Sequence, residues 1–233
     1  NSGTIGDITG DFIGNYVSGS SRANGGAIFN DGGTIGDITG DFIGNYASGG
    51  YSPASGGAID NSRTIGDITG SFINNYVSAY SDALGGAIAN TITSTNPASY
   101  PTGSTHSFIG NITGDFIGNY ALSSQGIASG GAILNEESLG RITGDFVGNY
   151  VSGLEGLGGA IANVRDSDGY GTYSGIASLA GNFINNYAEG VQSAFGGAIY
   201  NTGTILGYDV PIDKLLPLPV ITINISDTGD VYT

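Results

Sequence analysis

Short apolar runs alternate with glycine and polar turns along most of the chain, and this alternation repeats. The first copy, residues 3–30, reads GTIGDITGDFIGNYVSGSSRANGGAIFN. Glycine, asparagine, threonine and β-branched residues dominate it, and no amphipathic pattern of helical period lasts for three turns. The copy instead divides into three short strand-like pieces, residues 4–9, 11–17 and 27–30. The pattern therefore predicts an all-β chain built from one repeated unit of three strands.

Two signatures define the repeat. The signature F-[IV]-x-N-Y begins at Phe12, Phe42, Phe72, Phe116, Phe146 and Phe183, and GGAI-x-N begins at Gly25, Gly56, Gly85, Gly130, Gly158 and Gly196. Successive phenylalanines are 30, 30, 44, 30 and 37 residues apart, and a period of this size is typical of repeat architectures. We predict a parallel β-helix of about six to seven three-stranded coils over residues 1–202, with coils stacked at about 4.8 Å.

Stacking of the coils would place equivalent residues in columns. The expected interior columns are an aromatic one, formed by the six phenylalanines above, and an aliphatic one, formed by Ile28, Ile59, Ile88, Ile133, Ile161 and Ile199. Two asparagine ladders are expected, one at Asn15, Asn45, Asn75, Asn119, Asn149 and Asn186, and one at Asn30, Asn61, Asn90, Asn135, Asn163 and Asn201. Stacked asparagines can pass amide hydrogen bonds from coil to coil, and asparagine tolerates the left-handed backbone of a tight turn.

Two further positions of the repeat are constant. A tyrosine follows each asparagine of the first ladder, which predicts a tyrosine column at Tyr16, Tyr46, Tyr76, Tyr120, Tyr150 and Tyr187. The residue after each phenylalanine is Ile or Val, as at Ile13 and Val147. Neighbours in a strand face opposite sides, so these residues either point outward or mark a bend of the chain.

The charge balance excludes several classes of partner. The net charge is −15, and the only cationic residues besides one histidine are Arg22, Arg63, Arg141, Arg165 and Lys214. This field repels phosphate backbones and anionic membranes, so we expect no nucleic-acid binding. No apolar run approaches the length of a membrane-spanning helix, so we expect no direct membrane insertion of this segment. The absence of cysteine excludes disulfides and thiolate metal sites, and the start at Asn1 suggests a processed or excised segment.

Two acidic columns suggest a cation site. Asp7 and Asp37 begin one column, and Asp11 and Asp41 begin another. Because like charges one strand apart repel, both columns should face solvent or share cations. These four aspartates offer the hard oxygen ligands that calcium prefers, although the chain lacks the G-G-x-G-x-D nonapeptide of calcium-binding β-rolls. Calcium is the one cofactor that the sequence suggests.

Two insertions and a tail depart from the repeat. Residues 91–107 and 164–175 both leave the same corner of the coil, as binding loops often do, and idle surface loops are the alternative. They carry Tyr100, Tyr170 and Tyr173 as candidate glycan contacts. In the tail, residues 203–233, alternation over residues 220–226 predicts a strand that caps the last coil or pairs with a neighbouring chain. The candidate assembly residues are Val220, Ile221, Thr222, Ile223, Asn224 and Ile225.

No constellation of residues indicates catalysis. The only histidine, His106, lies in an insertion without the context of a nucleophile elbow. Paired carboxylates for glycoside hydrolysis are available, but the acids recur with the repeat, whereas a catalytic pair normally interrupts one. We therefore expect no catalytic residues and a protein that is not an enzyme.

The paired signatures, here GGAI with FIGN, FINN or FVGN over residues 1–202, resemble the repeats of polymorphic outer-membrane proteins and related autotransporter passengers. The resemblance implies a right-handed parallel β-helix, a location outside the cell or on a bacterial cell surface, and a role in adhesion or self-association. This sequence departs from the family in two ways, since it contains neither the C-terminal translocator barrel nor the cysteines of many members.

Three functions follow as hypotheses. The first is a non-enzymatic structural or adhesive β-helix, a surface passenger or fibre segment whose partner is a surface receptor or glycan. The second is a subunit of an extracellular filament, in which the first coil of one copy sits on the last coil or tail of another. The third is a polysaccharide-binding or polysaccharide-cleaving β-helix, which requires aromatic and acidic residues converging on one lateral face.

Overall fold

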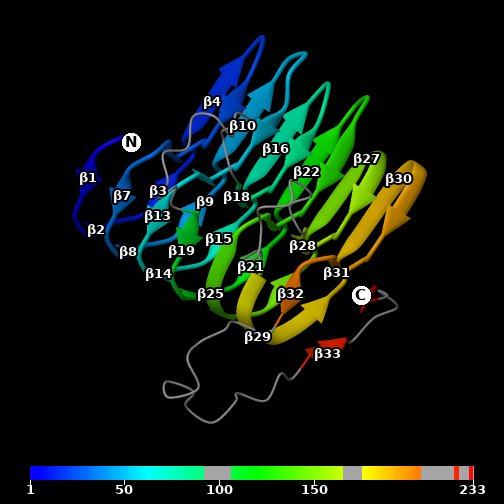
Figure 1. Ribbon diagram of the computed structural model, residues 1–233. Coiled ribbons are helices and arrows are strands. Elements are labelled where there is room, and N and C mark those ends of the chain that lie inside the picture. Colours follow the sequence, from blue (N-terminus) through cyan, green and yellow to red (C-terminus); the bar gives the residue numbers. More distant parts are fainter. Residues whose placement is uncertain (92–105, 165–174, 206–222, 226–230, 233) are drawn as a thin grey trace.

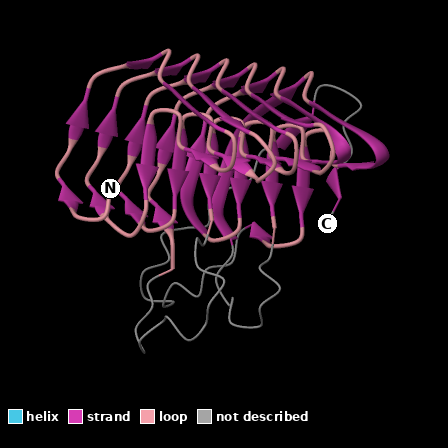
Figure 2. Ribbon diagram, turned by 90° about the horizontal axis from the view of Figure 1, so that it is seen from above, coloured by secondary structure: helices cyan, strands magenta, loops and turns pink. Residues whose placement is uncertain are grey.

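The computed structural model describes residues 1–91, 106–164 and 175–205, and the backbone of 223–225 and 231–232. These residues form 34 strands and no helix, and the paired strands run parallel. Figures 1 and 2 show the coils following one another from the N-terminal to the C-terminal end. The predicted parallel β-helix is confirmed, and its strands fall into three sheets.

The first wall is a 17-stranded sheet that receives up to three very short strands from each coil. The first position holds β1 (Thr4–Ile5), β7 (Thr34–Ile35), β13 (Thr64–Ile65), β19 (Phe108–Ile109) and β32 (Thr204–Ile205). The second holds β2 (Ile8–Thr9), β8 (Ile38–Thr39), β14 (Ile68–Thr69) and β20 (Ile112–Thr113), and the third holds β3 (Phe12–Ile13), β9 (Phe42–Ile43), β15 (Phe72–Ile73), β21 (Phe116–Ile117), β26 (Phe146–Val147) and β33 (Ile223–Ile225). Two longer strands, β25 (Ser138–Thr143) and β29 (Gly175–Ile184), span several positions.

The second sheet has ten strands and forms a wing beside the main coil (Figure 1). Its outgoing arms are β4 (Tyr16–Gly19), β10 (Tyr46–Gly49), β16 (Tyr76–Ala79) and β22 (Tyr120–Ser123), and its returning arms are β5 (Ala23–Asn24), β11 (Ala54–Ser55), β17 (Ala83–Leu84) and β23 (Ile127–Ser129). In the last two coils, single bent strands, β27 (Tyr150–Leu157) and β30 (Tyr187–Phe195), provide both arms. The sequence predicts only loops where the returning arms lie.

The third wall is a seven-stranded sheet with one strand from each coil. It consists of β6 (Ile28–Asn30), β12 (Ile59–Asn61), β18 (Ile88–Asn90), β24 (Ile133–Asn135), β28 (Ile161–Asn163), β31 (Ile199–Asn201) and β34 (Val231–Tyr232). The first and third walls enclose the main core, in which the Phe12 and Ile28 columns meet.

The register pairs like with like, as the repeat predicts. Phe12 lies opposite Phe42, and Ile28 lies opposite Ile59. Consecutive phenylalanine rings are parallel, with centroids 4.6–4.9 Å apart, in agreement with the predicted coil spacing. A second, smaller core lies between the arms of the wing and contains only Ala and Val, such as Ala47 and Ala54. The small side chains allow the two arms to lie close together.

The two glycines of GGAI have separate steric roles. A Cβ on Gly56, whose φ is +61°, would lie 2.2 Å from the carbonyl oxygen of Ile59 in the same coil. A Cβ on Gly57 would lie 2.0 Å from the carbonyl oxygen of Gly86 in the next coil. The first glycine therefore permits the left-handed corner, and the second permits the close approach of neighbouring coils.

A second corner lies between the strand that begins at Phe12 and the strand that begins at Tyr16, and between their equivalents in the other coils. Its residue with a left-handed backbone comes immediately before the asparagine of the Asn15 column. Gly44 has a φ of +63°, and Asn74 and Asn185, at the same position of their coils, have φ of 54° and 53°. Among the described residues, ladder asparagines such as Asn75 do not have positive φ, so the left-handed conformation that asparagine tolerates is used one position earlier. The bend at this position splits the predicted strand of residues 11–17 into β3 and β4.

The described parts of the tail add strands to the last coil. Strand β33 pairs with β29, placing Ile225 opposite Phe183, and β34 pairs with β31, placing Val231 opposite Ile199. Both pairs are parallel. Of the predicted assembly residues, Val220, Ile221 and Thr222 lie outside the described residues, as do most residues of the two insertions.

Candidate functional site: the stacked columns

The interior members of the Asn15 column use every polar atom of their side chains. Asn45 is fully buried, and its Nδ2 donates to Oδ1 of Asn75 at 2.9 Å and to the carbonyl oxygen of Phe12 at 2.8 Å. The backbone N–H of Asn45 also donates to Asn75 Oδ1, at 2.9 Å. Each amide of the interior thus links three successive coils, and the FxxN signature encodes a hydrogen-bonded ladder beside a stacked aromatic column.

The Asn30 column runs in the same direction on the other side of the core. Asn30 Nδ2 donates to Asn61 Oδ1 at 2.8 Å, and the series continues to Asn201. Asn1 adds a member that the sequence analysis missed, because its Nδ2 donates to Asn30 Oδ1 at 3.1 Å. The sequence contained this signal, because Asn1 lies three residues before Thr4, just as Asn61 lies three residues before Thr64.

The acidic columns cap backbone amides of the next coil. Asp7 Oδ1 accepts from the N–H of Asp37 at 3.0 Å, and Asp11 Oδ1 accepts from the N–H of Asp41 at 2.9 Å. Asn111 and Ser71 accept the equivalent bonds where aspartate is replaced. One carboxylate oxygen of these candidate calcium ligands is therefore engaged by the backbone. Within residues 1–91, 106–164 and 175–205, no three acidic or histidine side chains are grouped to hold a metal ion, and calcium binding stays a prediction.

The outer face of the corner carries two uncharged columns, which we call the lateral strip. It consists of the Ile13 column (Ile13, Ile43, Ile73, Ile117, Val147 and Ile184) and the Tyr16 column (Tyr16, Tyr46, Tyr76, Tyr120, Tyr150 and Tyr187). Ile13 is 63% exposed and Tyr16 is 64% exposed. The alternative left open by the sequence is thereby settled: the chain bends after Ile13, and Ile13 also points outward. Burial and the neighbouring phenols raise the pKa of Tyr76, Tyr120 and Tyr150 above the usual range.

The tyrosine rings stack on one another. Their centroids are 4.8–5.1 Å apart and their planes are within 13° of parallel. Because each interior ring has both faces covered by its neighbours, the column presents ring edges and hydroxyl groups. Sugar rings stack on open aromatic faces, so this column is a poor platform for a polysaccharide. The candidate glycan contacts Tyr100, Tyr170 and Tyr173 lie outside the described residues.

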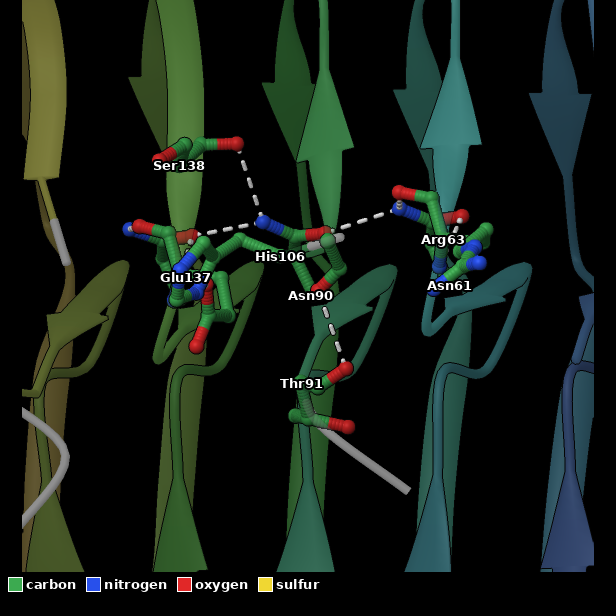
Figure 3. A network of polar contacts seen from close by, with 9 residues as sticks. Asn61, Arg63, Asn90, Thr91, His106, Glu137 and Ser138 are labelled. Carbon is green, nitrogen blue, oxygen red and sulfur yellow. Dashed lines mark hydrogen bonds and ion pairs between the residues drawn. The ribbon is translucent and has the colours of Figure 1, made fainter. Parts of the chain in front are cut away.

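His106 lies beside a buried acid rather than a nucleophile. Its Nδ1 is 3.2 Å from Oε2 of Glu137, which is 2% exposed, whereas the histidine side chain is 39% exposed (Figure 3). The pair sits next to the Asn30 column, where Asn90 Nδ2 donates to the carbonyl oxygen of Ser138 at 3.1 Å. Ser107 Oγ donates to the carbonyl oxygen of Thr91 at 3.0 Å, so the two described ends of the first insertion are bonded to each other.

Asp60 is a buried acid that interrupts the outer face of the third wall. It is 1% exposed and accepts a hydrogen bond from Ser55 Oγ at 2.6 Å, while its Oδ1 has no hydrogen-bond partner within the described part of the chain. Burial, opposed by the Ser55 bond, raises its pKa to about 6. The equivalent positions of the other coils hold no acid; they are Phe29, Ala89, Leu134, Ala162 and Tyr200. Sequence reasoning passed over this residue because it varies between coils.

Comparison with known proteins gives no match: no family model, no curated protein and no solved structure corresponds to the chain. No helix in the described residues is long and apolar enough to cross a membrane. The geometry of the columns is therefore the basis for the functional argument.

Proposed function

We propose that the chain is a non-enzymatic, extracellular structural or adhesive β-helix, a surface passenger or fibre segment. The observation that carries this proposal is the unbroken course of the Phe12 and Asn15 columns through six coils. The recurring asparagines and aspartates bond to neighbouring coils, and this use of polar groups suits a rigid rod. Such a rod presents its outer columns at a constant spacing, which suits repeated weak contacts with a surface partner.

Two sequence features support the same proposal. The alternating GGAI and FxxN signatures resemble those of autotransporter passengers, which implies a surface location and a role in adhesion. The net charge of −15 favours solubility and suits a partner that is neutral or cationic.

Bead adhesion tests the proposal. Beads coated with the folded chain are expected to adhere to one another or to a cell surface, and beads coated with the heat-unfolded chain are the matched control. Equal behaviour of both bead types would contradict the proposal. Release of reducing ends from a panel of polysaccharides by the soluble chain would favour the polysaccharide-cleaving alternative, for which the stacked tyrosine faces offer little support.

A filament subunit is the second candidate, because the C-terminal end of the array accepts parallel strands. Strands β33 and β34 continue two of the three walls beyond the last coil. Electron microscopy with light scattering across concentration tests this candidate. Fibres about 2–3 nm wide, the scale of one coil cross-section, that disappear on deletion of residues 220–226 are expected, and a monomer at all concentrations would contradict it.

A further inference from the structure

The lateral strip keeps its residue types where other outward positions change. The column of Thr4 changes to Phe108, that of Asp7 to Arg141, and that of Thr9 to Ala180. In contrast, the Ile13 column holds only Ile or Val, and the Tyr16 column only Tyr, through all six coils. The interior does not require this, since both columns lie outside the core. Within the stack Ile117 remains 38% exposed. The end members Tyr16 and Tyr187 are 64% and 48% exposed, and the tyrosines between them are half-buried.

The two edges of the strip differ in charge. On one side lies the Asp11 column, with Asp11, Asp41, Asp115 and Asp145 at four of its six positions. On the other side lies the column of Ser18, with Ser in four coils, Leu122 in the fourth and a single acid, Glu189, in the sixth. Neither column of the strip contains a charged residue. The strip thus combines an aliphatic column with a column of tyrosine ring edges and hydroxyl groups, between two polar columns. Aromatic residues are enriched in protein-binding surfaces, and exposed apolar patches mark such sites.

We propose that the lateral strip binds a basic, amphipathic polypeptide segment lying along the axis of the solenoid. Its apolar side chains contact the Ile13 and Tyr16 columns, and its Lys or Arg side chains face the Asp11 column. The inference rests on the proposed function and specifies the kind of partner that the lateral strip would bind. A second copy of this chain does not fit, because the chain has 5 Lys and Arg against 20 Asp and Glu and would place acids against acids.

The spacing of the strip suits an amphipathic helix. Tyrosine rings repeat every 4.8–5.1 Å along the axis, and an α-helix rises about 5.4 Å per turn. Six coils span about 25 Å at the usual strand spacing, which a helix of about 16 residues matches. A helix with one apolar stripe flanked by cations would therefore meet about one apolar contact per coil.

Fluorescence anisotropy with a labelled synthetic Leu/Lys helical peptide of that length tests the inference. The full chain is expected to bind it, with affinity falling as salt increases, and not to bind a Leu/Glu peptide of the same pattern. The variant I43T/I73T/I117T keeps every charge and every β-branched position, and we expect it to bind about tenfold or more weakly. The variant I5T/F108T, which removes two exposed apolar residues of the first wall, is the matched control and should bind like the parent chain.

A second variant removes the rim charge without removing the backbone caps. In D41N/D115N/D145N each new amide can accept the same N–H bond, as the amide of Asn111 does in the Asp7 column. This variant should lose affinity and most of its salt dependence. Failure of the Leu/Lys peptide to bind the parent chain, or equal binding to the parent and to folded I43T/I73T/I117T, would overturn the inference. Bead adhesion that persists in those cases would leave the proposed function standing.

Discussion

At the residue scale, two glycines of the repeat, Gly57 and Gly44, are restricted for different reasons. A Cβ at Gly57 meets backbone oxygens of the next coil, whereas a Cβ at Gly44 meets nothing within 4 Å. Only its positive φ restricts Gly44, and asparagine already adopts that conformation at Asn74. The glycine content of the chain therefore includes positions that tolerate no other residue and positions that tolerate asparagine.

We expect Gly57→Ala to lower the free energy of unfolding by about 3 kcal/mol or more, because a whole coil must shift to admit one methyl group. Gly44→Asn should change it by about 0.5 kcal/mol or less, since asparagine accepts the left-handed conformation. Urea denaturation of both variants checks the pair. Similar losses in both would show that the close approach at Gly57 is not what restricts that position.

Burial makes Asp60 a source of pH-dependent instability. Its pKa is about 6 in the folded chain, against the ordinary value of 3.8 that applies in the unfolded chain. Below the lower value both states are protonated and no penalty exists; as pH rises from about 4 to about 6, only the folded state resists ionisation, so stability falls. The shift corresponds to about 3 kcal/mol above pH 6.

Asp60→Ala should therefore stabilise the chain at pH 7 by up to about 3 kcal/mol, and the advantage should vanish near pH 4. Combining it with Ser55→Leu copies the pair found in the next coil, Leu84 and Ala89, and provides a packing control. Thermal unfolding of the three chains across pH checks this. A stability difference that does not vary with pH would contradict the assigned burial of the charge.

At the scale of the elements, the sequence predicted the columns but not the wing. The Phe12, Asn15 and Asn30 columns could be predicted because the same residue recurs in all six repeats, and equivalent residues of stacked repeats lie above one another. The returning arms, such as Ala54–Ser55, escaped because they are two or three residues long, vary between coils and bury only Ala. The capping by Asp7 and Asp11 also escaped, since which atom a carboxylate contacts depends on coordinates. The sequence predicted that both columns face solvent or share cations, but not that they bond to the backbone.

The role of the Asn15 column can be tested by replacing a buried asparagine of the column, Asn75, and the exposed asparagine next to it, Asn74. Asn75→Ala removes the acceptor of the Asn45 N–H and Nδ2 and the donor to the carbonyl oxygen of Phe42. Buried polar groups left without partners should cost about 3–5 kcal/mol in total. Asn74→Gly, one residue away and exposed, should be nearly neutral because Gly44 and Gly118 hold that position in neighbouring coils. Chemical denaturation distinguishes the two, and equal effects would contradict the ladder.

At the scale of the whole molecule, the chain is a line of coupled coils, each held mainly by its two neighbours. The Phe12 column belongs to the main core, whereas the core between the arms of the wing contains only Ala and Val side chains. Stability should therefore be highest along the columns and lower in the wing. The same arrangement keeps the lateral strip straight, which the proposed docking of a long partner requires.

Hydrogen exchange followed by mass spectrometry tests the central claim, that the repeat signatures hold the coils together through inner ladders. The slowest exchange is expected in peptides that contain the backbone amides of Asn45, Asn75 and Asn119, which donate to buried side chains of the next coil. In the Asn75→Ala variant, protection should fall at Asn45 and in the adjoining coils and remain at Asn149. Fast exchange throughout the FxxN segments of the parent chain, with slow exchange confined to the wing, would contradict the account.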